Sequence, residues 1–153
     1  MKIYKILILI LFCKTIPYLL IGRLDANQIT IDMTGKAEFS GLSFKDKSRY
    51  RLFKSNGYWK SSKGDYGLHE CFGTLKNNKN NDASFNVFCK NTSQNNEYFI
   101  VKIYRGTKYQ DSGAGKATII ETSEGYEYLL SAECDHAITY IKENYFAMQK
   151  CRY

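Results

Sequence analysis

Alternation of apolar and polar residues is the feature of this sequence that most constrains its fold. Residues 27–33 place an apolar side chain at every second position, and the same period recurs in residues 83–90 and 97–105. A period of two is typical of β-strands with one buried face. Tyr and Phe, which strands favour, number 13 and 9 of the 153 residues. The sequence therefore predicts a mostly β protein.

Further strand candidates follow, separated by glycines and polar turns. In chain order these candidates, most of them short, are 36–40, 49–54, 58–60, 66–75, 116–122, 126–133 and 146–151. Asn56-Gly57 and Lys63-Gly64-Asp65 predict turns, and residues 106–115 predict a flexible loop. Gly67 and Gly73 lie inside a candidate strand, where glycine commonly marks a β-bulge or a barrel corner.

The C-terminal region has a different period. Ala137, Ile138 and Ile141 recur at helical spacing, and Asp135 can cap a helix start, which predicts a short helix over residues 135–143. The remaining strands need edge protection, which closure into a barrel provides. We expect a single antiparallel β-barrel of about eight strands with a short C-terminal helix; a β-sandwich is the alternative.

The N-terminus has the pattern of a secretory signal. Lys2 and Lys5 precede an apolar run over residues 6–13, and Ala26 is a small residue at a candidate cleavage site. The run is short against the roughly 20 residues of a spanning helix. We expect residues 1–26 to be a cleaved signal peptide and residues 27–153 to form one secreted or periplasmic domain without a stable membrane anchor. A retained anchor is the alternative.

Four cysteines remain after Cys13 leaves with the predicted signal, and an even number in an exported chain predicts disulfides. Cys71 and Cys89 are symmetric about a polar loop, so a hairpin folded there places them opposite each other. Cys134 and Cys151 bracket the last segment. We therefore predict the pairs Cys71–Cys89 and Cys134–Cys151. Because no C-x-x-C pair occurs, we expect neither a metal site nor a cofactor.

The formal net charge of +7 raises the question of an anionic partner. The densest basic stretch, residues 45–54, alternates with aromatic and aliphatic residues. It can be an anion- or nucleic-acid-binding face or the solvated side of a strand. We favour the solvated strand and expect no nucleic acid partner. The sequence sets no oligomeric state.

Three aromatic residues around one turn suggest a ligand site at a barrel end. Tyr58 and Trp59 precede the turn at residues 63–65, Tyr66 leaves it, and His69 lies deeper on the same strand. Aromatic walls with one titratable group are common in small-molecule sites. Strict alternation would put His69 and Tyr66 on opposite faces, so this site requires a bulge near Gly67. The alternative is that these rings cover the barrel end.

A pattern of glycines, aromatics and cysteines carries a family resemblance over roughly residues 48–134. It comprises Gly57-Tyr58-Trp59, residues 64–67, Cys71, Gly73, Cys89, Gly113, Gly115 and Gly125-Tyr126. In these residues the chain resembles the allene oxide cyclase and dirigent barrels, which are small secreted barrels of eight strands. The family usually has Gly-Thr-Gly before the last Tyr, whereas this chain has Thr122-Ser123-Glu124-Gly125. No cyclase or dirigent catalytic residue matches by motif, and none is carried over.

Three functions follow from these expectations. The first is a secreted or periplasmic, non-enzymatic β-barrel that binds a small ligand or a component of the cell envelope. The second is a barrel enzyme of the cyclase or isomerase type, with His69 and tyrosines in its lumen. The third is a structural or inhibitory protein that acts through its surface. The first two require a cavity, because an eight-stranded barrel can be filled by its own side chains.

Signal cleavage gives the first testable prediction. The exported protein should begin at or near Asn27, because Ala26 follows a basic start and a short apolar run. N-terminal sequencing of exported protein measures this directly. An intact Met1 would reject cleavage and favour a retained anchor.

Overall fold

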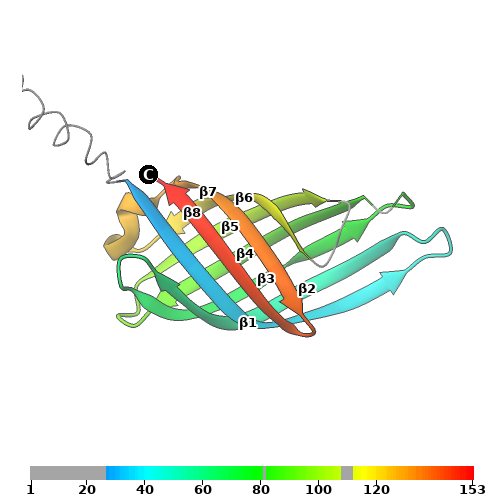
Figure 1. Ribbon diagram of the computed structural model, residues 1–153, viewed down its shortest axis with the longest axis horizontal. Helices are drawn as coiled ribbons and strands as arrows, with labels where there is room; N and C mark the ends of the chain where they lie inside the picture. Colours follow the sequence, from blue (N-terminus) through cyan, green and yellow to red (C-terminus); the bar gives the residue numbers. More distant parts are fainter. Residues whose placement is uncertain (1–26, 81, 108–111) are drawn as a thin grey trace, which may run out of the picture.

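The computed structural model describes residues 27–80, 82–107 and 112–153, which form a closed barrel of eight antiparallel strands (Figure 1). The strands are β1 (Gln28–Ser43), β2 (Arg49–Ser61), β3 (Tyr66–Asn77), β4 (Ala83–Ser93), β5 (Tyr98–Thr107), β6 (Ser112–Thr122), β7 (Glu133–Ile141) and β8 (Asn144–Arg152). A 3-10 helix, η1 (Glu124–Leu129), connects β6 to β7. Each strand pairs with the next in sequence, and β1 closes the barrel against β8. The barrel is the expected architecture.

The alternation of the sequence separates the inside of this barrel from the outside. On β4 and β8 every second side chain is buried and its neighbours are mostly exposed. The core contains apolar side chains from all eight strands and from η1, including Ile31, Phe53, Leu75, Val87, Phe99, Ile119, Leu129, Ile138 and Ala147. Inward positions are thus occupied by packed side chains, as is common for a barrel of this size.

Two facing glycines correct the predicted strand boundaries. Gly35 pairs with Gly57, and both β1 and β2 run through this pair without a break. A Cβ on Gly57 would lie 2.1 Å from the Thr34 carbonyl oxygen and 2.6 Å from the Gly35 Cα. The glycines therefore allow two strands to approach closely inside a strongly curved wall. The predicted turn at Asn56-Gly57 was wrong, whereas the turn after β2 has Gly64 at a φ of +96°.

The predicted C-terminal helix was also wrong. Residues 135–143 lie mostly in β7, where Cys134, His136 and Ile138 point inward. Pairing with β6 on one side and β8 on the other outweighs the local helical spacing. The short helix lies earlier instead, where Tyr126 and Leu129 of η1 are buried.

The loop predicted between β5 and β6 is shorter than expected. Gly113 and Gly115 both belong to β6 and pair with β7. A register shift, the one irregularity in the pairing of these two strands, falls between Ile100 and Val101. The predicted signal peptide, with Ala26, lies outside the described residues. Among the helices of the described chain, none is long and apolar enough to span a membrane.

Both predicted disulfides are confirmed. Cys71 lies directly opposite Cys89 on the β3–β4 hairpin, and Cys134 lies opposite Cys151 on the β7–β8 hairpin. The Cα atoms are 4.1 and 3.9 Å apart, and the two bridges link residues 18 and 17 apart in sequence. All four cysteines point inward and are buried. Two structural disulfides are compatible with an exported protein.

Removing one bridge should lower stability without changing the fold. In the chain-entropy model, the double variant Cys71→Ala/Cys89→Ala should lose about 2–4 kcal/mol of unfolding free energy. The pair Cys134→Ala/Cys151→Ala should behave similarly, because it closes a loop of nearly the same length. Urea unfolding monitored by Trp59 fluorescence gives both values. A loss below about 0.5 kcal/mol would contradict this role for the bridges.

Candidate functional site

A histidine and a tyrosine pair inside the barrel. His69 on β3 and Tyr145 on β8 are both buried, and their rings stack with centroids 5.7 Å apart. His69 Nε2 and the Tyr145 hydroxyl share a hydrogen bond. This contact joins strands from opposite parts of the chain, and it gives each ring a polar partner within the core.

Burial governs the protonation of this pair. It lowers the pKa of His69 to about 4 and raises the pKa of Tyr145 to about 12. Both side chains are therefore uncharged near neutral pH. A histidine with this pKa is a weak base, and its exposed fraction of 1% leaves no open path to solvent in the described structure. The geometry suits a structural polar contact better than general base catalysis.

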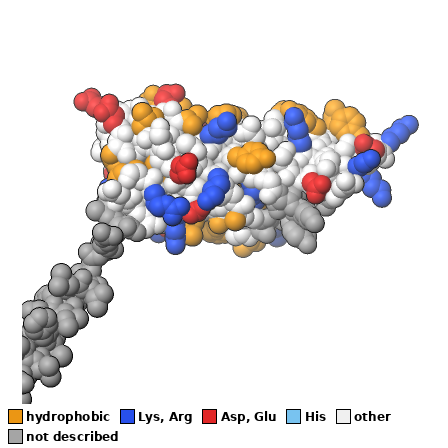
Figure 2. All heavy atoms as spheres, turned by 90° about the horizontal axis from the view of Figure 1, so that it is seen from above, with side chains coloured by type: hydrophobic (Ala, Val, Ile, Leu, Met, Phe, Trp, Pro, Cys, Tyr) orange, Lys and Arg blue, Asp and Glu red, His pale blue; other side chains and the backbone are white. Residues whose placement is uncertain are grey.

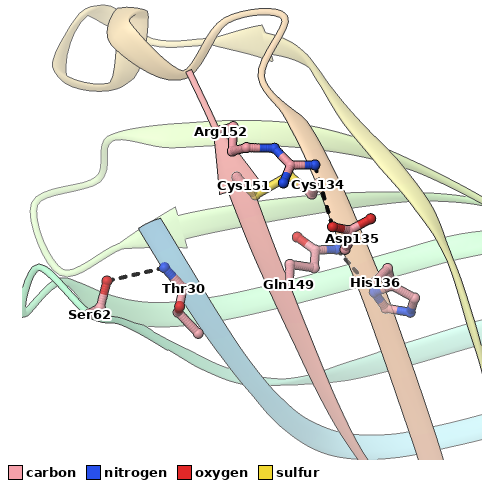
Figure 3. Close-up of a disulfide and its surroundings, with 8 residues drawn as sticks. All are labelled: Thr30, Ser62, Cys134, Asp135, His136, Gln149, Cys151 and Arg152. Atoms are coloured by element: carbon pink, nitrogen blue, oxygen red, sulfur yellow. Dashed lines mark hydrogen bonds and ion pairs between the residues drawn. A yellow bond between two sulfur atoms is a disulfide. The ribbon is translucent and has the colours of Figure 1, made fainter. Parts of the chain in front are cut away.

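A second polar pair lies near the other disulfide (Figure 3). The side chains of Gln149 and His136 point toward each other, with the amide nitrogen 3.4 Å from His136 Nδ1. Burial lowers the pKa of His136 to about 4, and the positive charge of Arg105 adds to this effect. The predicted helix over residues 135–143 would have included His136, but this residue lies on β7, which turns its side chain inward and leaves it 3% exposed.

Arg105 on β5 is a buried, charged side chain that the sequence pattern did not lead us to expect. Its guanidinium lies over the Phe85 ring, 5.1 Å from the centroid. Gly115 makes room for it, since a Cβ there would lie 2.9 Å from the Arg105 Cβ. Burial lowers the pKa of Arg105. The alternation of β5 could have revealed this residue, because Arg105 continues the inward positions of Val101 and Ile103.

Trp59 closes one end of the barrel. Its indole nitrogen donates to the carbonyl oxygens of Leu68 and Thr92, at 3.1 and 3.2 Å. Its ring packs edge-on against Phe99, 5.2 Å between centroids, and Tyr126 of η1 contacts both. Of the three rings that the alternative placed over the barrel end, only Trp59 lies there, and its neighbours are Phe99 and Tyr126.

The four residues predicted to form one ligand site are divided between two faces of the wall. Trp59 and His69 are buried inside, whereas Tyr58 and Tyr66 are 67% and 60% exposed on the outside. The required bulge is absent from the described strands, because the β2–β3 and β3–β4 registers run through Gly67 without a shift. Strict alternation therefore separates His69 from Tyr66. The site cannot form as predicted.

Two of the four, Tyr58 and Trp59, are among the residues that line a groove on the outer wall. The groove crosses β2, β1, β8 and β7 and reaches Gly113 on β6, and its volume is about 720 Å³. The lining residues are Asp32, Met33, Thr34, Tyr58, Trp59, Lys60, Gly113, Ala137, Ile138, Thr139, Phe146, Ala147 and Met148. Most of the lining is apolar, and this volume lies within the roughly 300–1,000 Å³ of small-molecule sites.

Strand register explains why the wall is hollow here. Tyr58, Thr34, Phe146 and Thr139 form one outward row across four strands. The large rings of Tyr58 and Phe146 alternate in this row with two small threonines. A parallel row contains the Lys60–Asp32 ion pair, 3.9 Å long, followed by Met148 and Ala137. Large side chains thus stand around small ones, with two opposite charges at one rim.

The outer surface elsewhere alternates between apolar and charged side chains. Figure 2 shows hydrophobic side chains lying among lysines, arginines and acidic residues on one face of the barrel. In the described part of the chain, no group of three or more His, Cys, Asp or Glu side chains could hold a metal ion.

Comparisons of this chain with models of protein families, with curated proteins and with solved structures found no match. The eight-stranded barrel is the architecture that the resemblance to allene oxide cyclase and dirigent barrels implies. Because a barrel alone does not identify that family, membership in it stays a prediction.

The two buried histidines predict how stability depends on pH. Their pKa values of about 4 in the fold lie below the ordinary value of 6.5. Between these values the unfolded chain binds more protons, so unfolding free energy should fall as pH drops from about 6.5 to about 4. The slope should reach about 1.4 kcal/mol per pH unit for each histidine.

Chemical denaturation at several pH values tests this dependence. His69→Gln and His136→Gln should each remove a large part of the slope, whatever they do to stability at neutral pH. If unfolding free energy depends on pH as steeply in both variants as in the parent protein, the pKa values of the two histidines are not lowered in the fold. That result would contradict their burial in an interior closed to water.

Proposed function

We propose that the protein is an exported, non-enzymatic binding protein that holds a small, largely apolar ligand in its outer groove. The observation that carries this proposal is the hollow of about 720 Å³ between Tyr58, Phe146 and Met148. Export, to the periplasm or the cell exterior, is supported by the two disulfides and by the signal pattern of residues 1–26.

The groove favours a ligand that contains a ring and few polar groups. Tyr58 and Phe146 are 67% and 52% exposed, so both offer ring surface for stacking or edge contacts. Thr34 and Thr139 lie beside them and offer hydroxyls for hydrogen bonds. The Lys60–Asp32 pair at the rim can orient a polar substituent of the ligand. No group in this lining is a strong candidate for acid–base catalysis, which favours binding over an enzyme.

Filling the groove should abolish binding. The neutral fluorescent probe N-phenyl-1-naphthylamine should bind the parent protein. Thr34→Trp and Ala137→Phe should each weaken its affinity by at least about tenfold, because both place a large ring in the hollow. Fluorescence titration measures the affinity. Thr118→Trp is the matched control, since Thr118 lies on β6 outside the groove lining.

The outcomes separate the competing functions. Equal probe affinity in the parent, Thr34→Trp and Ala137→Phe proteins would contradict the groove proposal. Loss of binding in His69→Gln but not in Thr34→Trp would place the ligand in the lumen and favour the cyclase or isomerase alternative. A parent protein that does not bind the probe would favour the structural or inhibitory alternative.

A further inference from the structure

A row of two phenylalanines between two lysines crosses the outer wall from β2 to β5. Strand register places Lys54 opposite Phe72, Phe72 opposite Phe88, and Phe88 opposite Lys102. All four side chains point outward, and the two phenylalanines are 53% and 45% exposed. Two adjacent rings are therefore open to solvent with one lysine on either side.

Four lysines on this wall lie over aromatic rings. Lys54 Nζ lies 5.8 Å from the Phe72 centroid, and Lys102 Nζ lies 6.0 Å from that of Phe88. Lys76 and Lys90 make similar contacts with tyrosines. The described chain has the ion pairs Lys60–Asp32, Lys116–Asp135 and Arg152–Asp135, and neither Lys54 nor Lys102 belongs to one of them. The lysine charges beside the two phenylalanines are thus not neutralised by an ion pair in the described structure.

A hollow adjoins this row on the side of Phe72. It spans β1, β2 and β3, and its volume is about 570 Å³. Its lining includes Lys54 and Phe72 from the row, the carboxylate of Glu38, and the small polar residues Ser40 and Thr74. An exposed ring, hydroxyl groups, one cation and one carboxylate therefore share one concave surface.

We infer that this surface, consisting of Lys54, Phe72, Phe88, Lys102 and the adjoining hollow, binds an anionic polysaccharide. Neighbouring strands are about 4.8 Å apart, so the two lysines stand about 14 Å apart across three strand intervals. A single small anion cannot contact both. A sugar chain with a carboxylate on successive units can, while the C–H faces of its rings stack on the two phenylalanines and its hydroxyls contact Ser40 and Thr74.

The charges around the row favour a sugar chain over a nucleic acid. Strand register places Glu38 opposite Lys54 in the same row. Glu70 lies two residues before Phe72 on the outer face of β3. A continuous phosphate backbone would meet these carboxylates, whereas a chain with separated charges and many hydroxyls can hydrogen-bond to them. Export, which is part of the proposed function, also favours an extracellular or envelope polymer.

Binding to polygalacturonate tests the inference. Isothermal titration calorimetry should detect binding at low salt, with affinity falling at about 0.15 M salt. Neutral dextran should bind at least about tenfold more weakly. Phe72→Ala/Phe88→Ala and Lys54→Ala/Lys102→Ala should each lose about tenfold in affinity for polygalacturonate, and the lysine variant should also show a weaker salt dependence.

Matched variants show whether the effect is specific. Lys45→Ala/Lys79→Ala removes the same charge from two exposed loop positions and should change affinity by less than about twofold. Phe72→Tyr/Phe88→Tyr keeps both rings and should retain binding. Thr34→Trp should also retain it, so failure of the outer groove and failure of this surface are distinguishable.

Three results would overturn the inference. The first is a Phe72→Ala/Phe88→Ala protein that binds polygalacturonate like the parent. The second is an equal loss in Lys45→Ala/Lys79→Ala, which would mean nonspecific charge attraction. The third is tighter binding of single-stranded oligothymidylate than of polygalacturonate, with the same dependence on Phe72 and Phe88, which would assign the surface to nucleic acid.

Discussion

Pairing of the first strand with the last is the interaction on which the rest of this structure depends. Residues 28–36 of β1 pair with residues 144–152 of β8, which removes the two edges that an open sheet would leave. Closure also defines an inside. Only inside a closed wall can His69 and Tyr145, from β3 and β8, reach each other away from water. The two inward disulfides then hold the neighbouring hairpins in register.

Because packed side chains occupy the interior, the two binding surfaces that we propose lie on the outer wall. Trp59, Phe99 and Tyr126 close one end, and Arg105 packs on Phe85 further along the lumen. The outer wall, by contrast, has hollows where strand register places small outward residues between large ones. This happens both at the groove of β7, β8, β1 and β2 and beside Phe72 on β3. The same alternation that packs the core thus shapes both proposed binding surfaces.

The sequence predicted the barrel and both disulfides because these depend on alternation and symmetric spacing, which are local. It missed what depends on strands from distant parts of the chain. Gly35 and Gly57 look like separate breaks in sequence, but they face each other across β1 and β2. The residue spacing near Ile138 predicted a helix, but pairing with β6 and β8 makes this segment the strand β7. The predicted ligand site required a β-bulge near Gly67 that would turn Tyr66 and His69 to the same face, and β3 has no bulge there.

Native-state hydrogen exchange of the β1–β8 amides tests most directly the claim that closure seals the interior. We predict that amides such as those of Ile31 and Ala147 exchange only through global unfolding, with the same opening free energy that urea denaturation gives. An opening free energy well below the global value at this seam, with the other strands still protected, would contradict it. The barrel would then open in its native state and expose its lumen.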